Sequence, residues 1–173
     1  MPRHLPSFWR KGDTLGARIA IVPSLVALDL AAEDSSDAIR QLGSRLVEGG
    51  FAGKRYIDAV LSREAVYPTG LEFPSCGVAL PHGEPVDVKD AALAIARCTP
   101  EVPFGCMDDS PKTTPVRLVA LLAVSAPEEH LDVIGHLIGA FSNATLCGKL
   151  LELEDPSEVA AVLDKAVNGE AKR

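Results

Sequence analysis

The chain has 173 residues, a formal net charge of −7 and a hydrophobic fraction of 47%. A chain of this length suits one domain, and such a domain buries about 70% of the surface that its unfolded form exposes. The acidic balance argues against general nucleic-acid binding, which requires basic faces. No stretch reaches the roughly 20 apolar residues of a membrane helix, so we expect a single-domain protein with no direct membrane insertion.

The start of the chain differs in character from the rest. Residues 1–24 contain several prolines and show no clear hydrophobic period, so we expect a flexible N-terminal extension ahead of one domain over residues 25–173. The start lacks the long apolar core of a secretory signal peptide. We therefore expect a cytoplasmic protein whose four cysteines are reduced. None of them forms a Cys-x-x-Cys pair, so we expect no structural zinc site.

The first half of the expected domain alternates between strand and helix. Residues 22–30 are expected to contain the first strand, and residues 34–36 are good N-caps for a helix that follows. Apolar positions recur at helical spacing up to residue 47, and two glycines then end the helix. A second helix is expected over residues 54–63. Its inward-facing residues are predicted to be Ile57, Val60 and Leu61.

The second half supplies the remaining strands. Residues 78–80 and 91–98 are candidate strands, and residues 116–124 are a stronger one. The run from 118 to 124 is wholly apolar, as expected for a strand that is covered on both faces. Pro127 suits the first turn of the next helix. The buried stripe of that helix is predicted to be Leu131, Ile134, Leu137, Ile138 and Phe141.

Two further helices are expected near the end of the chain. One covers residues 144–151. The other has a clear start, because Asp155 can act as the N-cap, Pro156 occupies the first helical position and Glu158 completes a capping box. Strands that alternate with helices in this way predict an α/β fold, a three-layer α/β/α sandwich.

A histidine follows the strand at 78–80 directly, in the segment Pro81-His82-Gly83. Pro81 fixes its own φ and restricts the residue before it, which holds the strand exit in one geometry. Gly83 has no side chain to crowd the ring, so a large anion or a partner protein could approach His82 closely. A lone histidine after a proline is, however, more often a turn residue with a satisfied hydrogen bond.

Two further residues have the chemistry that a phosphorylated histidine needs. Arg63 precedes a turn at 68–70, and arginine binds phosphate oxygens in a bidentate fork without losing its charge. His130 follows two glutamates at a predicted helix start, where unpaired N–H groups and the helix dipole favour anions. Its ring can donate a hydrogen bond to the same group that Arg63 binds.

Four separated motifs occur in one order along the chain. They are Arg63-Glu64, Pro68-Thr69-Gly70, Val78-Ala79-Leu80-Pro81-His82 and Glu129-His130-Leu131. Together they resemble the enzyme IIA domain of the bacterial phosphoenolpyruvate-dependent sugar phosphotransferase system, fructose–mannitol type (PTS EIIA type-2). The form Arg-Glu-Ala-x-x-Pro-Thr-Gly is most similar to the galactitol-type members. The resemblance covers residues 25–166, nearly all of the expected domain.

The resemblance implies an activity as well as a mixed β-sheet. His82 would accept a phosphoryl group from the histidine phosphocarrier protein and pass it to a cysteine of enzyme IIB, as a phosphotransferase of sugar or polyol uptake. Arg63 would bind the phosphoryl oxygens, and His130 would support the ring or the charge. The family implies neither a cofactor nor a metal. Its membrane component selects the sugar, so the resemblance does not name one.

Two alternative functions stay open at this point. Nitrogen-regulatory enzyme IIA proteins share the fold and the histidine, but they signal through their phosphorylation state. A Cys/His hydrolase is the second alternative, because Cys76 lies six residues before His82. A small buried thiol is the commoner role for such a cysteine.

Overall fold

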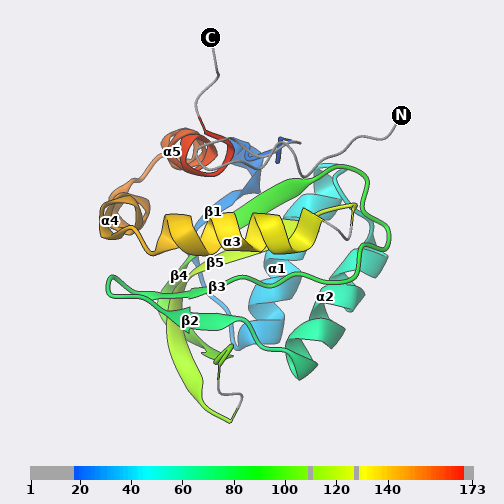
Figure 1. Ribbon diagram of the computed structural model, residues 1–173, viewed down its shortest axis with the longest axis horizontal. Coiled ribbons are helices and arrows are strands. Elements are labelled where there is room, and N and C mark those ends of the chain that lie inside the picture. Colours follow the sequence, from blue (N-terminus) through cyan, green and yellow to red (C-terminus); the bar gives the residue numbers. More distant parts are fainter. Residues whose placement is uncertain (1–17, 109–110, 127–128, 170–173) are drawn as a thin grey trace.

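The computed structural model describes residues 18–108, 111–126 and 129–169, and places a five-stranded sheet between two layers of helices (Figure 1). A short 3₁₀ helix, η2 (Pro23–Leu25), precedes the first strand. The strands are β1 (Val26–Leu30), β2 (Gly70–Glu72), β3 (Gly77–Ala79), β4 (Ala92–Gly105) and β5 (Thr113–Ala123). The helices are α1 (Ser35–Glu48), α2 (Lys54–Val66), α3 (His130–Phe141), α4 (Ala144–Glu152) and α5 (Pro156–Asn168).

The sheet is mixed, with the strand order β1-β4-β5-β3-β2. The central pair β4–β5 is antiparallel, whereas β1 runs parallel to β4 and β3 runs parallel to β5. In the β3–β5 pair, Val78 lies opposite Leu118 and Ala79 opposite Val119. The expected mixed sheet is confirmed. Because β3 and β5 are parallel, the segment that leaves β3 runs beside the last residues of β5.

The apolar strand predicted at 116–124 is β5, and it is covered on both faces. Alternate side chains belong to two separate hydrophobic clusters, as a period of two requires. One cluster contains Leu118, Ala120 and Leu122, and the other contains Val119, Leu121 and Ala123. All six side chains are buried. The prediction that residues 118–124 are covered on both faces is confirmed.

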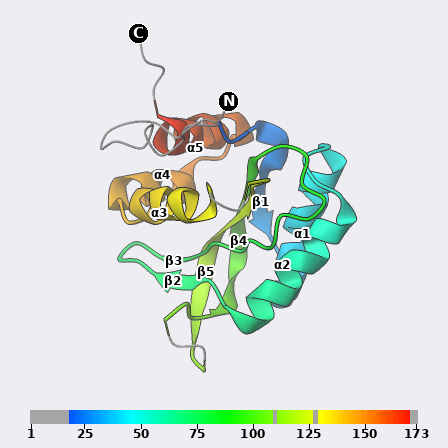
Figure 2. The same cartoon turned by 45° about the vertical axis from the view of Figure 1, so that its right-hand side comes forward.

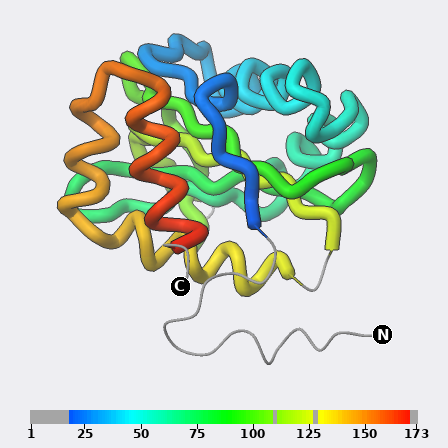
Figure 3. The backbone as a smooth tube through the Cα atoms, turned by 90° about the horizontal axis from the view of Figure 1, so that it is seen from above, coloured from blue at the N-terminus to red at the C-terminus, as the bar shows by residue number. Residues whose placement is uncertain are grey.

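Two helical layers cover the two faces of the sheet. Figure 2 shows α1 and α2 on one side of the strands and α3, α4 and α5 on the other. The same separation is visible from above, where the strands run between the cyan helices and the yellow-to-red ones (Figure 3). The sheet face under α1 and α2 presents small side chains, which let these helices approach closely: Ala27, Ala79, Ala92, Ala94 and Ala96. The predicted three-layer α/β/α sandwich is confirmed.

Helix ends follow the predicted capping signals. The Asp34 side chain caps α1 by accepting a hydrogen bond from the backbone N–H of Asp37, and Gly49 ends the helix. In α5 the Asp155 side chain accepts from Ser157 N–H, with a proline at the first helical position. These caps satisfy N–H groups that have no partner inside the helix.

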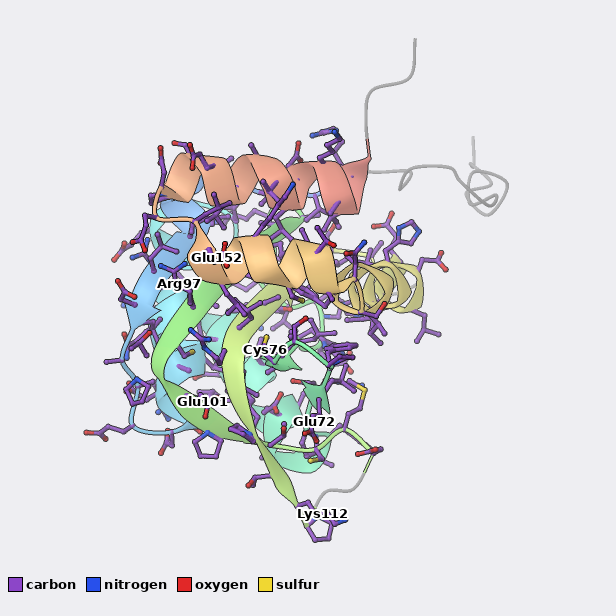
Figure 4. The ribbon with its side chains drawn as sticks, turned by 90° about the vertical axis from the view of Figure 1, so that its left-hand side faces the viewer. Glu72, Cys76, Arg97, Glu101, Lys112 and Glu152 are labelled. Atoms are coloured by element: carbon purple, nitrogen blue, oxygen red, sulfur yellow. The ribbon has the colours of Figure 1, made fainter. Side chains whose placement is uncertain are left out.

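The end of α4 is fixed by a buried arginine from the sheet. Arg97 on β4 lies below the last turn of α4 (Figure 4) and donates to the carbonyl oxygens of Leu150 and Leu153, at 3.3 and 2.7 Å. Its guanidinium therefore pairs carbonyls that the helix leaves open at its C-terminus.

Two predicted buried stripes are partly wrong. In α2 the buried residues are Tyr56, Val60 and Glu64, whereas Ile57 and Leu61 are half-buried. In α3 the buried residues are Val133, Leu137 and Phe141, which recur every four residues and face the sheet. Leu131 is 85% exposed because it lies outside that stripe. Pro127 lies outside the described residues, and the short strand β2 was not predicted.

The described part of the predicted N-terminal extension packs on the domain. Ile19 and Ile21 are buried in the core, and Ala20 forms a parallel bridge with Ala92 of β4. Arg18 makes an ion pair with Asp164 of α5 at 2.8 Å. Residues 1–17 lie outside the described residues, so a flexible extension stays a prediction. None of the helices in the described ranges is long and apolar enough to cross a membrane.

Candidate functional site

The three predicted site residues meet at one pocket. Arg63 comes from the last turn of α2, His82 from the segment that leaves β3, and His130 from the first residue of α3. The pocket has a volume of about 520 Å³. Its other lining residues are Val66, Tyr67, Pro68, Thr69, Gly83, Glu84, Met107, Asp108, Leu131 and Ile134. All four of the separated motifs thus contribute residues to one cavity.

His82 is half-buried, and one ring nitrogen is already engaged. Its Nδ1 lies 2.8 Å from the carbonyl oxygen of Leu80. A carbonyl oxygen only accepts, so Nδ1 carries the proton in this bond and the neutral ring keeps its lone pair on Nε2. The structure therefore offers Nε2 as the nucleophilic atom.

The environment keeps this ring neutral. Burial lowers the pKa of His82 below its usual value, and the Arg63 guanidinium and, when protonated, the His130 ring lower it further. The hydrogen bond to the Leu80 carbonyl acts in the opposite direction, because it favours the protonated ring. The net shift is downward, so at neutral pH the ring is uncharged and Nε2 is free to form a bond.

His130 and Arg63 line the same pocket, and each has a buried nitrogen atom without a hydrogen-bond partner. The His130 ring centroid lies 5.7 Å from that of His82, with the planes tilted by 53°. Within the described residues, His130 Nε2 and Arg63 Nε are buried without a hydrogen-bond partner. The Arg63 guanidinium lies 5.1 Å from the centre of the Tyr67 ring, a cation–π distance. Buried polar atoms without partners are uncommon, and here two of them lie in the walls of one pocket.

Hydrogen bonds to the Glu64 carboxylate fix the chain ahead of His82. The buried Glu64 carboxylate accepts from the backbone N–H and the hydroxyl of Thr69, each at 2.9 Å. The Thr69 hydroxyl in turn accepts from Leu80 N–H at 3.2 Å, and Leu80 O accepts from His82 Nδ1. Glu64 and Thr69 belong to the motifs singled out from the sequence, but this role for them was not predicted.

A second set of bonds fixes the chain after His82. Leu122 N–H donates to Pro81 O at 3.0 Å. The Tyr56 hydroxyl accepts from Gly83 N–H at 3.1 Å and donates to Leu122 O at 2.5 Å. No sequence signal had pointed to Tyr56 beyond its place on α2.

Gly83 has a different neighbour from the one expected. A Cβ atom at this position would lie 2.8 Å from the backbone carbon of Ala59 and the backbone nitrogen of Val60, both on α2. Glycine is therefore required because the strand exit touches the backbone of α2. The sequence-based interpretation, close approach of an anion or partner, does not explain this contact.

Apolar side chains surround the mouth of the pocket. Among the described residues, four large hydrophobic side chains are exposed, and each of them lines this pocket. Their exposed fractions are 64% for Val66, 61% for Tyr67, 38% for Met107 and 85% for Leu131. Exposed apolar side chains gathered at one place are typical of an interaction surface.

The cysteine of the hydrolase alternative lies elsewhere. Cys76, labelled in Figure 4, comes directly before β3, and that extended strand separates it from His82. The neighbouring Cys147 thiol lowers the pKa of Cys76. The Cys76–His82 pair that a hydrolase needs is not formed. Within the described ranges, no group of three or more His, Cys, Asp or Glu side chains is placed to hold a metal ion.

Known proteins share this sequence pattern. The family model described as "Phosphoenolpyruvate-dependent sugar phosphotransferase system, EIIA 2" matches residues 21–166. The galactitol-specific EIIA component of Escherichia coli K12 is 28% identical over 122 residues, which are 70% of this chain and 81% of that protein. The mannitol-specific EIICBA component of Pasteurella multocida is 32% identical over 138 residues, 80% of this chain. The chain spans 22% of that longer protein.

Solved structures share the fold. The complex of mannitol enzyme IIA and phosphorylated enzyme IIB from Escherichia coli matches with a TM-score of 0.69 at 26% identity, over 84% of this chain and 97% of that one. Nitrogen regulatory protein IIA-Ntr from Neisseria meningitidis matches with a TM-score of 0.68 at 30% identity, over 83% and 96%. The family model covers most of the chain, which confirms the resemblance that the four motifs indicated. The chain belongs to the EIIA type-2 family of the phosphoenolpyruvate-dependent sugar phosphotransferase system.

Proposed function

We propose that this chain is a cytoplasmic phosphocarrier of a sugar or polyol uptake system. It accepts a phosphoryl group on His82 Nε2 from the histidine phosphocarrier protein and passes it to enzyme IIB. Arg63 binds the phosphoryl oxygens, and His130 supports their negative charge. Its relatives are mannitol-, galactitol- and fructose-specific components, which supports a role in carbohydrate uptake.

One observation carries the proposal. Arg63 and His130, whose Nε and Nε2 atoms have no partner, line the same pocket as the His82 ring, whose Nδ1 is already bonded to Leu80 O. A phosphoryl group on His82 Nε2 supplies the acceptor oxygens that both nitrogens lack. Charge-assisted bonds of this kind are about twice as strong as neutral ones. The pocket is therefore more complete with a bound anion than without one.

The chemistry is a pair of displacements at phosphorus. The lone pair of His82 Nε2 attacks the phosphohistidine of the donor, the new N–P bond forms, and the donor imidazole leaves with the electrons of the old bond. In the second step a cysteine thiolate of enzyme IIB attacks, and His82 leaves as a neutral ring that still holds its Nδ1 proton. Phosphoryl transfer needs alignment and charge stabilisation more than covalent help from the protein, and the site residues supply both.

The apolar rim supports protein partners as substrates. A small metabolite would leave Leu131 and Tyr67 in water, whereas a protein face can cover them together with Val66 and Met107. The solved complex of mannitol enzyme IIA with phosphorylated enzyme IIB supports an enzyme IIB as the acceptor for this chain.

A regulatory role is the second candidate. The nitrogen regulatory protein from Neisseria meningitidis matches this chain at 30% identity, and it favours a module that signals through its phosphorylation state. The two functions differ in the second transfer step. A carrier passes its phosphoryl group to an enzyme IIB encoded beside it, whereas a regulator keeps the group and binds its targets differently in the two states.

The test is phosphorylation in a reconstituted chain. The protein is incubated with phosphoenolpyruvate, enzyme I and the phosphocarrier protein, and intact and digested chains are weighed by mass spectrometry. We expect one acid-labile, base-stable phosphoryl group on His82, lost in His82→Ala and discharged when enzyme IIB is added. Normal labelling of a folded His82→Ala variant would overturn the assignment. Labelling without discharge to any neighbouring enzyme IIB would favour the regulatory role.

A further inference from the structure

The hydrogen-bond ladder between β3 and β5 continues past the end of β3 and reaches His82. In the register of this pair, Val78 lies opposite Leu118 and Ala79 opposite Val119, so a continued register sets His82 opposite Leu122. In a parallel ladder, the N–H of a residue donates to the carbonyl of the residue before its opposite partner. Its own carbonyl accepts from the N–H of the residue after that partner. Leu122 N–H makes the first of these bonds, to Pro81 O at 3.0 Å.

The second bond of this step is replaced by a side chain. Gly83 N–H donates to the Tyr56 hydroxyl at 3.1 Å, and that hydroxyl donates to Leu122 O at 2.5 Å. A phenol from α2 is thus inserted into the sheet ladder directly after His82. The hydroxyl suits this place because it accepts one hydrogen bond and donates another.

We propose that Tyr56 is a positioning residue for His82. Its hydroxyl holds the peptide that follows the histidine at a fixed distance from β5, while Leu122 N–H holds the peptide that precedes it. With both neighbours fixed, the ring is directed so that Nδ1 meets Leu80 O and Nε2 faces the pocket. The proposal rests on the proposed function only in that it takes Nε2 as the reacting atom.

The surroundings of Tyr56 leave few alternatives for its hydroxyl. The side chain is 1% exposed, so its hydroxyl has no access to bulk water. Burial raises the pKa of Tyr56 above its usual value, which keeps the phenol protonated and able to donate. Without the hydroxyl, Gly83 N–H and Leu122 O would both lose their partner in a buried place.

The contact between Gly83 and α2 adds an independent restraint. The strand exit passes so close to α2 that a Cβ on Gly83 would lie 2.8 Å from the Ala59 backbone carbon. The hydroxyl bridge therefore joins the strand exit to β5 while the exit stays against α2. Both restraints act on Gly83, one through its N–H and the other at its Cα.

The test compares Tyr56→Phe with a matched control. Asn168→Leu removes buried side-chain bonds to the Ile19 backbone, at 3.0 and 2.9 Å, on the far helix α5. Both variants lose a buried polar group, but only Tyr56→Phe alters the restraint on His82. Two readouts are taken: the ¹⁵N spectrum of the His82 ring without any donor, and the rate of phosphoryl transfer from the phosphorylated phosphocarrier protein.

For Tyr56→Phe we expect a smaller fraction of the Nδ1–H tautomer and a kcat reduced about tenfold with KM unchanged, because misplacement of a reacting atom by 1 Å can cost about 10²-fold. Asn168→Leu should leave both readouts at their wild-type values. An unchanged tautomer and kcat in folded Tyr56→Phe would overturn the proposal and make Tyr56 structural. If the wild type takes no phosphoryl group, the proposed function fails, while the ring spectrum still tests Tyr56.

A second measurement covers the case in which Tyr56→Phe does not fold. The chain has two tyrosines, so 3-fluorotyrosine in a Tyr67→Phe background labels Tyr56 alone. Fluorine makes the phenol a stronger donor and a weaker acceptor without removing it. We expect the Gly83 amide signal and the His82 Nδ1 signal to shift together. A shift of the Gly83 amide with no change at His82 would overturn the proposal, as would the absence of both shifts.

Discussion

The two halves of the pocket are held in place to very different degrees. The strand exit that carries His82 is bonded on both sides, through Leu80 to Thr69 and through Tyr56 to β5. The other half is the first turn of α3, which no side chain of the described residues caps. There His130 Nε2 has no partner among the described residues, and Leu131 is 85% exposed.

This difference fits the two roles that we propose for the two halves. A nucleophilic nitrogen must be aligned with the phosphorus–nitrogen bond that breaks, so errors in its position are costly. A group that only stabilises charge tolerates more movement, because Coulomb attraction falls off gradually with distance. We therefore expect substitutions on the α2 and strand-exit half to have larger effects than those at α3.

The largest effect is expected for Arg63→Lys. The variant keeps the positive charge but loses the planar fork that binds two phosphoryl oxygens. Loss of a preorganised donor can slow a reaction by about 10²-fold, and we expect a decrease of this order in the transfer rate to His82. Stopped-flow or quench measurements with phosphorylated carrier protein give that rate. Arg55→Lys, on the exposed side of the same helix, is the matched control. Equal rates for the wild type and Arg63→Lys would make Arg63 structural.

A smaller but clear effect is expected for Gly83→Ala. The added methyl group would lie 2.8 Å from backbone atoms of α2. Backbone atoms inside a helix cannot easily move to make room for it. Overpacking of this kind costs about 1–3 kcal/mol of unfolding free energy, and it also displaces His82. Urea unfolding and the transfer rate measure the two consequences. In Gly139→Ala on α3 nothing lies within 4 Å of the new Cβ, so that control should be at least as stable as the wild type.

The fold and the three pocket residues could be predicted from the sequence because their signals are local. Proline, glycine and capping residues mark where elements end, and the three candidate site residues lie at such ends. His82 follows β3, Arg63 is in the last turn of α2, and His130 opens α3. The four motifs in their order, but no single one of them, indicated the family, and the family resemblance then implied a mixed sheet.

The supporting residues could not be predicted because their partners are distant in sequence. Tyr56 bonds Leu122, which is 66 positions away, and helical spacing says nothing about that carbonyl. The burial of Leu131 was wrongly predicted for a different reason. An apolar residue near the start of a helix can belong either to the core or to an exposed rim. Only the placement of α3 on the sheet separates Leu131 from the buried stripe that begins at Val133.

The pH dependence should reflect how the pocket lowers the pKa of His82. Below its pKa the ring is protonated and Nε2 has no lone pair, so acceptance slows as the pH falls through that value. Because burial holds the pKa below about 6.5, the usual histidine value, the wild type should stay active at a lower pH than a free imidazole would. Arg63→Gln removes one positive charge, so its acid limb should move to higher pH. A ¹⁵N titration of His82 without donor checks the same shift, and an acid limb that does not move would contradict it.

The smallest effect is expected at the loosely held half, in His130→Gln. Glutamine still reaches toward the phosphoryl oxygens with an N–H donor but cannot carry a positive charge. Water can also replace part of the lost contact at a half-buried position. Loss of a preorganised donor can slow a reaction by about 10²-fold, and we expect transfer in His130→Gln to slow by less than that. His82 should still be fully labelled at long times.

Two rates show which transfer step His130 affects. One is transfer from the phosphocarrier protein to His82, and the other is transfer from His82 to enzyme IIB. If His130 stabilises the phosphoryl group at the site, both steps should slow, since both pass through a transition state with charge on the same oxygens. If only one step slows, His130 contacts one partner, in keeping with its place beside the exposed Leu131. If neither rate changes, the α3 half supplies a docking rim alone, and the chemistry belongs wholly to the half that holds His82 and Arg63.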